Sequence, residues 1–254
     1  MARVIMNRPQ YLNAQSRVMI DELDDAFAKA VADDEVRVIV LSGNGEHFSS
    51  GHDIGTPEQT MYWEARGGRP TERMPFYNWM KTSYLDMSLR WRNLPKPTIA
   101  MVQGYCIFGG WMFASSMDLI FAADDAKFLA GHTEYFPVPW DLGVRKAKDI
   151  LFESRFIGAK EALEAGFVSR VIPREKLEEE TLAYAHRVAE NDPFVVQLCK
   201  FSVNHAQDAM GFTNAVEPAL QAAVLRLFQN SDMKRGKRMF GVDLALKHVR
   251  ETQE

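Results

Sequence analysis

Residues 98–118 decide the fold and read Thr-Ile-Ala-Met-Val-Gln-Gly-Tyr-Cys-Ile-Phe-Gly-Gly-Trp-Met-Phe-Ala-Ser-Ser-Met-Asp. The pattern predicts a buried apolar strand, a glycine-containing turn and a short apolar helix that begins at Gly109-Gly110. Glycines at a helix N-terminus leave backbone N–H groups unpaired and approachable, and the helix dipole adds positive charge there. The turn can therefore hold a developing oxyanion, or it can serve only the close packing of strand and helix.

A second segment, residues 38–54, reads Val-Ile-Val-Leu-Ser-Gly-Asn-Gly-Glu-His-Phe-Ser-Ser-Gly-His-Asp-Ile. It again places an apolar strand before a turn of small residues, Ser49-Ser50-Gly51. Two such strand ends can direct one amide each at a single carbonyl oxygen. The pair predicts an oxyanion hole with two backbone donors.

Further motifs follow in a fixed order along the chain. They are Asn7-Arg8-Pro9 with Asn13-Ala14, Phe48–Ile54, Lys96–Asp118, Gly158–Ala162, Ala165–Val168 and Val171-Ile172-Pro173. In order and spacing, these motifs resemble those of the crotonase superfamily, the enoyl-CoA hydratase/isomerase family. The resemblance spans nearly the whole sequence, and no single motif is unique to the family.

The resemblance implies an α/β fold, a crotonase-like spiral of strand-strand-helix units followed by an all-helical region that forms trimers. We expect the α/β core over residues 1–173 and the helical region over residues 174–254. The residues themselves agree with this division, because strand signals cease from Glu175 onward. The family further implies a homotrimer or a hexamer, although the apolar faces of the last helices would equally fit an intrachain core.

Local patterns predict the following elements. We expect strands over 36–41, 98–102, 119–122 and 168–172, and helices over 16–31, 144–156, 177–189, 194–209 and 212–228. Residues 56–94 show two helical patterns, interrupted at Arg66-Gly67-Gly68-Arg69-Pro70, and the resemblance implies a mobile helical flap in this region.

The family's shared chemistry is the stabilisation of an enolate or a tetrahedral oxyanion on a CoA thioester. By resemblance, the amides of Ser50 and Gly109 form the hole, and both residues are candidate catalytic residues. The acyl-CoA would lie along the same turns. The expected binding residues are Ser49, Ser50, Gly51, His52, Asp53, Ile54, Gly109, Gly110 and Met112.

The chain departs from its family at the proton-transfer positions. Hydratases of the family use two glutamates, and ungapped alignment places Met112 and His132 at those positions. Both usual glutamates are therefore absent, and the thioether of Met112 cannot transfer protons in place of one of them. This departure puts the hydration reaction in doubt. His132 and Glu134 are the candidate replacements, since an imidazole or a carboxylate can act as acid or base. Each can also be a structural loop residue, and Asp141 is interpreted as a helix cap.

Composition excludes several classes of protein. The net charge of −4 gives no basic footprint for nucleic acid. Two cysteines cannot build a disulfide framework, and both are interpreted as buried thiols. The histidines show no metal-ligand spacing, so we expect no metal and no cofactor other than the coenzyme A of the substrate. No apolar run is long enough to span a membrane, and the chain is expected to be cytoplasmic.

The sequence therefore predicts an enzyme of fatty acid metabolism, a lyase or isomerase of the enoyl-CoA hydratase/isomerase type that acts on an acyl-CoA thioester. The alternatives within enzymes are an isomerase, hydrolase or decarboxylase that uses His132 or Glu134. The alternative outside enzymes is a catalytically silent acyl-CoA-binding homologue.

Overall fold

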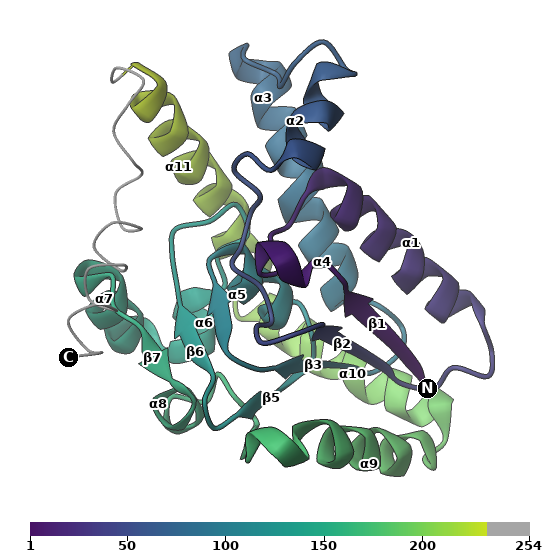
Figure 1. The fold of residues 1–254 in the computed structure, drawn as a ribbon. Helices are drawn as coiled ribbons and strands as arrows, with labels where there is room; N and C mark the ends of the chain where they lie inside the picture. Colours follow the sequence, from purple (N-terminus) through teal and green to yellow (C-terminus); the bar gives the residue numbers. More distant parts are fainter. Residues whose placement is uncertain (233–254) are drawn as a thin grey trace.

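The computed structural model describes residues 1–232 of the 254-residue chain. Its centre is a parallel sheet of five strands with helices on both faces (Figure 1). The strands, in spatial order, are β1 (Ala2–Met6), β2 (Ile39–Gly43), β3 (Thr98–Val102), β5 (Leu119–Ala123) and β8 (Arg170–Ile172). The α/β fold class is therefore as the sequence predicts.

A smaller second sheet lies beside the first. It consists of β4 (Tyr105–Ile107), β6 (Lys127–Leu129) and β7 (Ile157–Gly158) in the order β4-β6-β7. Ser49 forms an isolated bridge with Cys106, so the segment that follows β2 is tied to this second sheet. The turns that end β2 and β4 thereby lie next to each other.

The helices are α1 (Arg17–Ala32), α2 (Pro57–Glu64), α3 (Arg73–Met80), α4 (Asp86–Arg92), α5 (Gly109–Ser115), α6 (Val138–Leu142), α7 (Val144–Glu153), α8 (Ala159–Glu164), α9 (Leu177–Ala189), α10 (Pro193–Ala209) and α11 (Phe212–Asp232). A π-helical turn, Lys81–Leu85, joins α3 to α4, and single 3-10 turns occur at Pro9–Tyr11 and Arg174–Lys176. No helix of residues 1–232 is long and apolar enough to cross a membrane.

Both faces of the central sheet are buried, which explains the continuous apolar runs of its strands. Alternate residues face opposite sides. Leu41 belongs to the larger core with α1, α4 and α5, whereas Val40 and Ile99 belong to a second core under α9.

Helix α1 shows how the sequence determines one of the helices that pack on the sheet. Ser16 caps it by accepting a hydrogen bond from the Met19 amide, and Ile20, Leu23 and Phe27 bury one face. The predicted helices recur with ends shifted by a few residues, and among residues 174–232 no strand occurs. Residues 233–254 of the expected helical region lie outside the described part, and the boundary at residue 173 stays a prediction.

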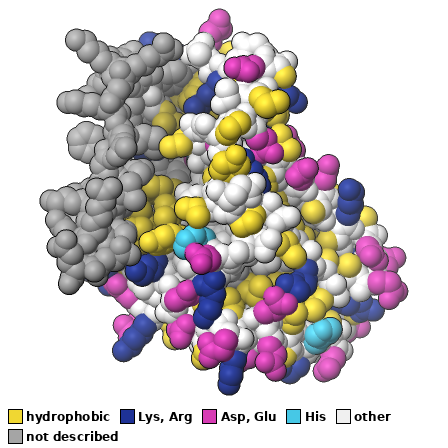
Figure 2. Space-filling model, viewed as in Figure 1, with side chains coloured by type: hydrophobic (Ala, Val, Ile, Leu, Met, Phe, Trp, Pro, Cys, Tyr) yellow, Lys and Arg dark blue, Asp and Glu magenta, His cyan; other side chains and the backbone are white. Residues whose placement is uncertain are grey.

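The flap region follows its sequence pattern. Helix α2 ends at Glu64, α3 begins at Arg73, and Gly67 and Gly68 between them adopt positive φ angles of 76° and 104°. Figure 1 shows α2 and α3 projecting from the body of the molecule beside α11. Figure 2 shows hydrophobic side chains gathered in the upper and middle part of the same view, with charged side chains around the lower rim.

The two cysteines differ in environment. Cys106 is buried, and burial raises the pKa of its thiol. Cys199 is exposed on α10, so the prediction of a buried thiol is wrong there. The error arises because α10 buries no residue of its own, although its sequence is as apolar as that of a core helix.

Candidate active site

The two predicted turns meet, and glycines allow the contact. Gly51 has a φ of +92°, and a Cβ on it would lie 2.8 Å from the carbonyl oxygen of Ile107 and 3.1 Å from the amide nitrogen of Gly109. A Cβ on Gly110 would lie 2.7 Å from the Ser49 carbonyl oxygen. Larger residues at Gly51 or Gly110 would therefore push the N-terminus of α5 away from the Ser49-Ser50-Gly51 turn.

Hydrogen bonding decides which amides of the first turn are available. Ser49 donates to the Tyr105 carbonyl at 3.0 Å, and Ser50 donates to the Leu12 carbonyl at 2.9 Å. Ser50 was expected to supply an oxyanion donor, and this geometry corrects that expectation because its N–H is already used.

The next free amide is that of His52. Gln15 bridges this segment by donating to the Gly51 carbonyl at 2.8 Å and accepting from Asp53 at 3.1 Å. Because successive N–H groups of an extended segment point to opposite sides, the His52 N–H points away from the Gln15 backbone. Within residues 1–232 it has no hydrogen-bond acceptor.

The second donor is held at the first turn of α5. Gly109 begins the helix, where amides have no intrahelical acceptor, and no described group accepts from it. Phe108 precedes it with φ 47° and ψ −100°, a conformation that a residue with a side chain rarely adopts. A hydrogen bond of 2.9 Å from its amide to the Leu129 carbonyl secures this turn.

A histidine–carboxylate pair lies beside the two amides. His52 Nε2 is 2.9 Å from Glu134 Oε2, and His52 Nδ1 is 3.0 Å from Gln15 Oε1. The Gln15 oxygen and the imidazole also flank Gly109, since a Cβ there would lie 2.3 Å from the former and 2.8 Å from Nδ1 of the latter. The structure thus joins His52, Glu134 and Gly109, which are three predicted site residues, to Gln15.

The carboxyl group of Glu134 is buried, and its charge is balanced. Burial opposes ionisation, but the adjacent His52 ring and its hydrogen bond outweigh it, so the pKa of Glu134 is lowered from its ordinary value. A buried carboxylate that stays ionised and touches an imidazole is suited to accept a proton from a bound ligand.

Tyr84 completes the surroundings of His52. Its ring centroid lies 4.4 Å from that of His52, and the next aromatic ring outward is Trp79, at 5.9 Å from Tyr84. Tyr84 belongs to the π-helical turn, an irregularity that often marks functional sites. Burial raises the pKa of Tyr84, so its hydroxyl stays protonated. Gln15 and Tyr84 are absent from the sequence-based prediction.

His132 does not join this cluster by a hydrogen bond. It is half-buried, its ring packs 4.7 Å from Phe136, and burial together with the charge of Arg226 lowers its pKa. His132 is thus an uncharged imidazole near neutrality, at the edge of the cluster.

Met112 and Ile54 lie at opposite extremes of exposure. Met112 is fully buried among core side chains, and Ile54 is 90% exposed in the loop before α2. Neither is part of the hydrogen-bonded cluster. At position 112 the structure, like the sequence, therefore offers no group that can transfer a proton.

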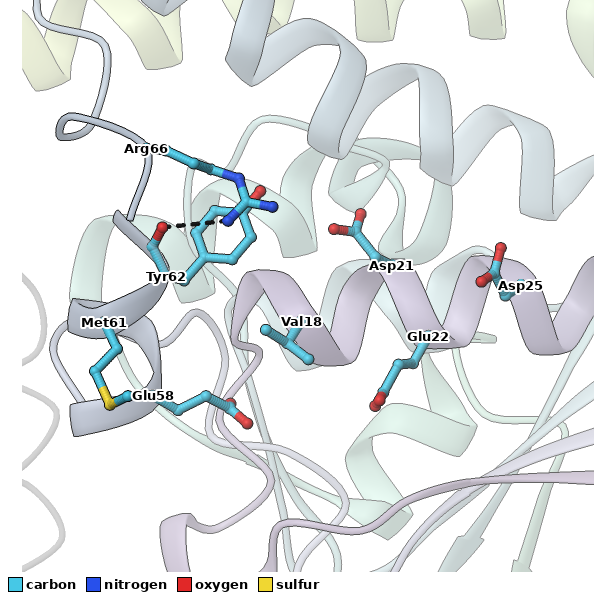
Figure 3. Close-up of a pocket in the computed structure, with 8 residues that line it drawn as sticks. All are labelled: Val18, Asp21, Glu22, Asp25, Glu58, Met61, Tyr62 and Arg66. Atoms are coloured by element: carbon cyan, nitrogen blue, oxygen red, sulfur yellow. Dashed lines mark hydrogen bonds between the residues drawn. The ribbon is translucent and has the colours of Figure 1, made fainter. Parts of the chain in front are cut away.

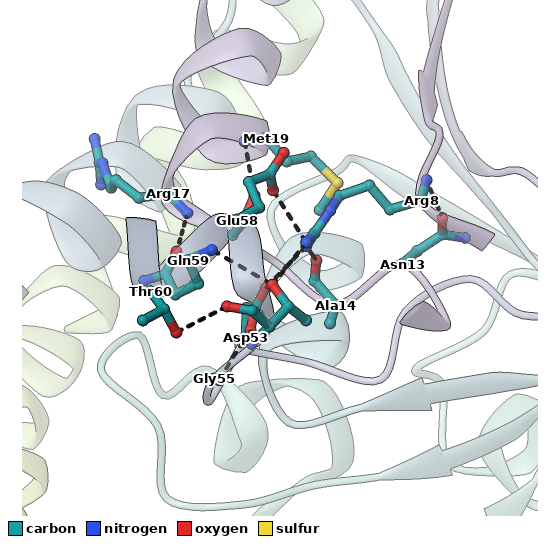
Figure 4. A network of polar contacts seen from close by, with 12 residues as sticks. Arg8, Asn13, Ala14, Arg17, Met19, Asp53, Gly55, Glu58, Gln59 and Thr60 are labelled. Carbon is teal, nitrogen blue, oxygen red and sulfur yellow. Dashed lines mark hydrogen bonds and ion pairs between the residues drawn. The ribbon is translucent and has the colours of Figure 1, made fainter. Parts of the chain in front are cut away.

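Asp53 anchors the loop that carries His52 (Figure 4). Its carboxylate is 3.0 Å from Arg8 Nη1 and accepts hydrogen bonds from the amides of Gly55 and Thr56. Burial would raise its pKa, but these hydrogen bonds prevail and lower it. Arg8 also forms an ion pair with Glu58 at 3.0 Å. Asp53, which was expected to bind the ligand, thus forms its contacts with residues of its own chain.

Asp141 is not a helix cap. It accepts hydrogen bonds of 2.8 Å from Trp111 Nε1 and from Ser115 Oγ, while Gly143 occupies the N-cap of α7. Burial raises the pKa of Asp141 to about 7, against the opposing effect of these two donors. The capping interpretation failed because the partners come from α5, far away in sequence.

Asp141 gives a prediction about stability. A folded-state pKa above the ordinary 3.8 means that folding stability falls as pH rises from about 4 through about 7. Asp141→Asn keeps both hydrogen bonds through its amide oxygen and has no charge to bury. The free energy of unfolding is measured with urea at several pH values. The difference between the variant and the wild type should shift in favour of the variant with rising pH, by on the order of a few kcal/mol. Asp149→Asn, at an exposed site, is the control, and a pH-independent difference for Asp141→Asn would contradict the assignment.

Two cavities on the surface lie away from this cluster. One, of about 600 Å³, lies between α1 and α2 and is lined by Val18, Asp21, Glu22, Asp25, Glu58, Met61, Tyr62 and Arg66 (Figure 3). Four carboxylates in its wall are unsuited to a phosphate-bearing ligand such as CoA. The other, of about 470 Å³, lies beside α9 and α10. Residues 1–232 contain no group of three or more His, Cys, Asp or Glu side chains arranged to hold a metal ion.

Comparison with known proteins agrees with this architecture. The Enoyl-CoA hydratase/isomerase family matches residues 1–241. EchA13 of Mycobacterium tuberculosis, whose name assigns it provisionally to the enoyl-CoA hydratases, is 36% identical over 94% of this chain and 81% of its own length. The crystal structure of a probable enoyl-CoA hydratase of Mycobacterium thermoresistibile superposes with a TM-score of 0.81 at 38% identity, over 91% of this chain and 94% of that one. A probable enoyl-CoA hydratase of Mycobacterium smegmatis gives a TM-score of 0.81 at 39% identity, over 88% of each chain. The chain belongs to the enoyl-CoA hydratase/isomerase family.

Proposed function

We propose that the protein is an acyl-CoA thioester enzyme that stabilises an enolate in a hole formed by the amides of His52 and Gly109. The observation that carries the proposal is the juxtaposition of these two unused amides with the ionised Glu134. The amides would donate hydrogen bonds to the thioester carbonyl oxygen. Glu134 would accept a proton from the α-carbon of the acyl group. Coenzyme A enters as part of the substrate, and the proposed reaction needs no other cofactor. We expect it to take place in the cytoplasm.

The single carboxylate favours one reaction within the family. Hydration needs one group to activate water and another to protonate carbon, and Met112 stands where one of them would be. A double-bond shift needs only one: Glu134 takes a proton from the α-carbon of a 3-enoyl thioester, and the electron pair is held as the enolate. Glu134 then returns the proton to the γ-carbon, which leaves a 2-enoyl thioester. The reaction balances without water or a redox partner.

Two thioesters distinguish the reactions. We expect a 3-enoyl-CoA to be converted to its conjugated 2-enoyl isomer, seen as a rise in the absorbance of the conjugated thioester. The rate of crotonyl-CoA hydration should be about two to four orders of magnitude lower than that of an enzyme with a full acid–base pair. Efficient hydration would show that a second group replaces the missing glutamate. Failure to turn over either thioester would contradict the proposed reaction and favour a silent acyl-CoA binder.

Self-association is also proposed, and α10 supports it. The helix attaches to its own chain through polar contacts, in which Lys200 meets Asp118 at 2.8 Å and Asn204 donates to the Arg92 carbonyl at 3.2 Å. Its outer side exposes apolar residues, namely Phe194, Val195, Leu198 and Phe201. This inverted distribution is typical of a face that another subunit covers. We infer a homotrimer, with a hexamer as the larger alternative.

Sedimentation tests the assembly. The wild type should sediment as a trimer or a hexamer at micromolar concentration. Phe201→Asp should shift it toward the monomer, since a charge would be buried in the interface. Val203→Asp, at an equally exposed residue on the other side of α10, is the matched control. A monomeric wild type would contradict the inference.

A further inference from the structure

Two arginines near the candidate site have no carboxylate partner within residues 1–232. Arg226 lies on α11, and Arg69 lies in the segment between α2 and α3. Neither forms an ion pair or a hydrogen bond with any described residue. By contrast, Arg8, Arg17 and Arg92 each contact an aspartate. Guanidinium groups without acceptors can donate hydrogen bonds to an anionic ligand.

The surroundings of Arg226 make its lack of a partner costly. Its Nε is buried and has no hydrogen-bond acceptor among the described residues, so a donor that needs a partner is withdrawn from water. The charge of Arg226 acts on both Glu134 and His132. Its helix, α11, packs against the π-helical turn that carries Tyr84 beside His52, and its Nε lacks, among residues 1–232, an acceptor that a ligand could bring.

Arg69 approaches the same place from the flap. Its guanidinium packs over the rings of Trp79, at 4.6 Å, and Phe76, at 5.0 Å. Its charge acts on Tyr84 and on Glu134. Helix α11, which carries Arg226, packs against α3, the helix that follows Arg69, and against the π-helical turn that carries Tyr84.

The local charges do not cancel. Glu134 is paired with His52, and Asp53 with Arg8. Arg226 and Arg69 thus add positive charge beside Glu134 that no ion pair among the described residues neutralises. This inference rests on the proposed function, because the acyl position is defined by the His52 and Gly109 amides.

We propose that Arg226, assisted by Arg69, binds a carboxylate at the far end of the acyl group, so that the substrates are CoA thioesters of dicarboxylic acids. A carboxylate can accept two hydrogen bonds from one guanidinium, which fixes the acyl chain in length and direction. An uncharged acyl chain would leave the Arg226 Nε unpaired and would bind more weakly.

Matched pairs of thioesters test the proposal by calorimetry on the full chain. Succinyl-CoA is compared with butyryl-CoA, and glutaryl-CoA with pentanoyl-CoA, because each pair differs in one terminal carboxylate. In at least one pair the dicarboxylic thioester should bind about ten- to a hundredfold more tightly. Arg226→Met should abolish this preference, and Arg69→Met should reduce it. Arg66→Met is the matched control, since Arg66 stacks on Tyr62 at 3.8 Å outside the cluster, and it should leave the preference intact.

The other outcomes are equally informative. Equal binding within both pairs would overturn the anionic subsite and leave the acyl-CoA function standing. A loss of affinity for CoA alone in Arg226→Met, equal to the loss for succinyl-CoA, would overturn it in favour of a phosphate contact. If none of the four thioesters binds, both proposals are wrong. Circular dichroism of each variant checks that it is folded.

Discussion

Removing the single N–H of Gly109 is expected to reduce turnover by about two to three orders of magnitude, which is the usual effect of losing one oxyanion donor. A backbone ester achieves this when glycolic acid replaces Gly109, because it deletes the N–H and adds no side chain. Proline suits a helix start, but the Cβ of any larger residue would lie 2.3 Å from Gln15 Oε1 and 2.8 Å from His52 Nδ1. A side-chain substitution would thus disturb His52 as well as the hole.

The same ester at Gly110 is the matched control. It also deletes an amide in the first turn of α5, but one whose direction around the helix differs. It should therefore change turnover much less. The Michaelis constant and the rate constant are measured separately, since an oxyanion donor should lower the rate constant more than it affects binding. Equal turnover of the Gly109 ester and the wild type would refute the hole.

Replacing Glu134 by glutamine should lower turnover by about two to four orders of magnitude, the range for a lost general base. The amide can still accept a hydrogen bond from His52, so the local structure should persist, which a thermal melt would verify. His132→Asn is the matched control in the same loop, and we expect it to retain most of the activity because His132 has no hydrogen bond to the cluster.

The pH profile separates the two candidates further. The pKa of Glu134 is lowered, so it remains a base well below neutrality and the rate should not decline until the pH falls under its ordinary value of 4.5. The pKa of His132 is also lowered, from 6.5. An acidic limb between pH 4.5 and 6.5 that disappears in His132→Asn would assign the proton transfer to His132 instead.

The sequence predicted the scaffold well because its signals are local. The β-branched run before Ser49, the glycines at 109 and 110, and the apolar spacing of residues 16–31 each act within a few residues, and all three recur in the structure. The two turns could be paired because the strands β2 and β3 are parallel neighbours, so their carboxyl ends share one edge of the sheet.

The details of the site depend on contacts between distant segments. Ser50 was the expected donor, but its amide is used by Leu12, and no local pattern announces that contact. Gln15 follows directly on the Asn13-Ala14 motif, which was a usable signal, yet its meeting with His52 requires the bridge to Gly51 and Asp53. Tyr84 carried no signal, because a π-helical turn looks like ordinary helix in sequence.

The aromatic contacts described above form a series that runs from Arg69 through Trp79 and Tyr84 to His52. Because each group in this series packs on the next, we expect a shift of the segment between α2 and α3 to move the imidazole next to Glu134 as well. A substitution in that segment is therefore expected to alter the proposed proton transfer without contacting the substrate. For anyone engineering the protein, the outermost residues of the flap are a means of adjusting acid–base chemistry from a distance.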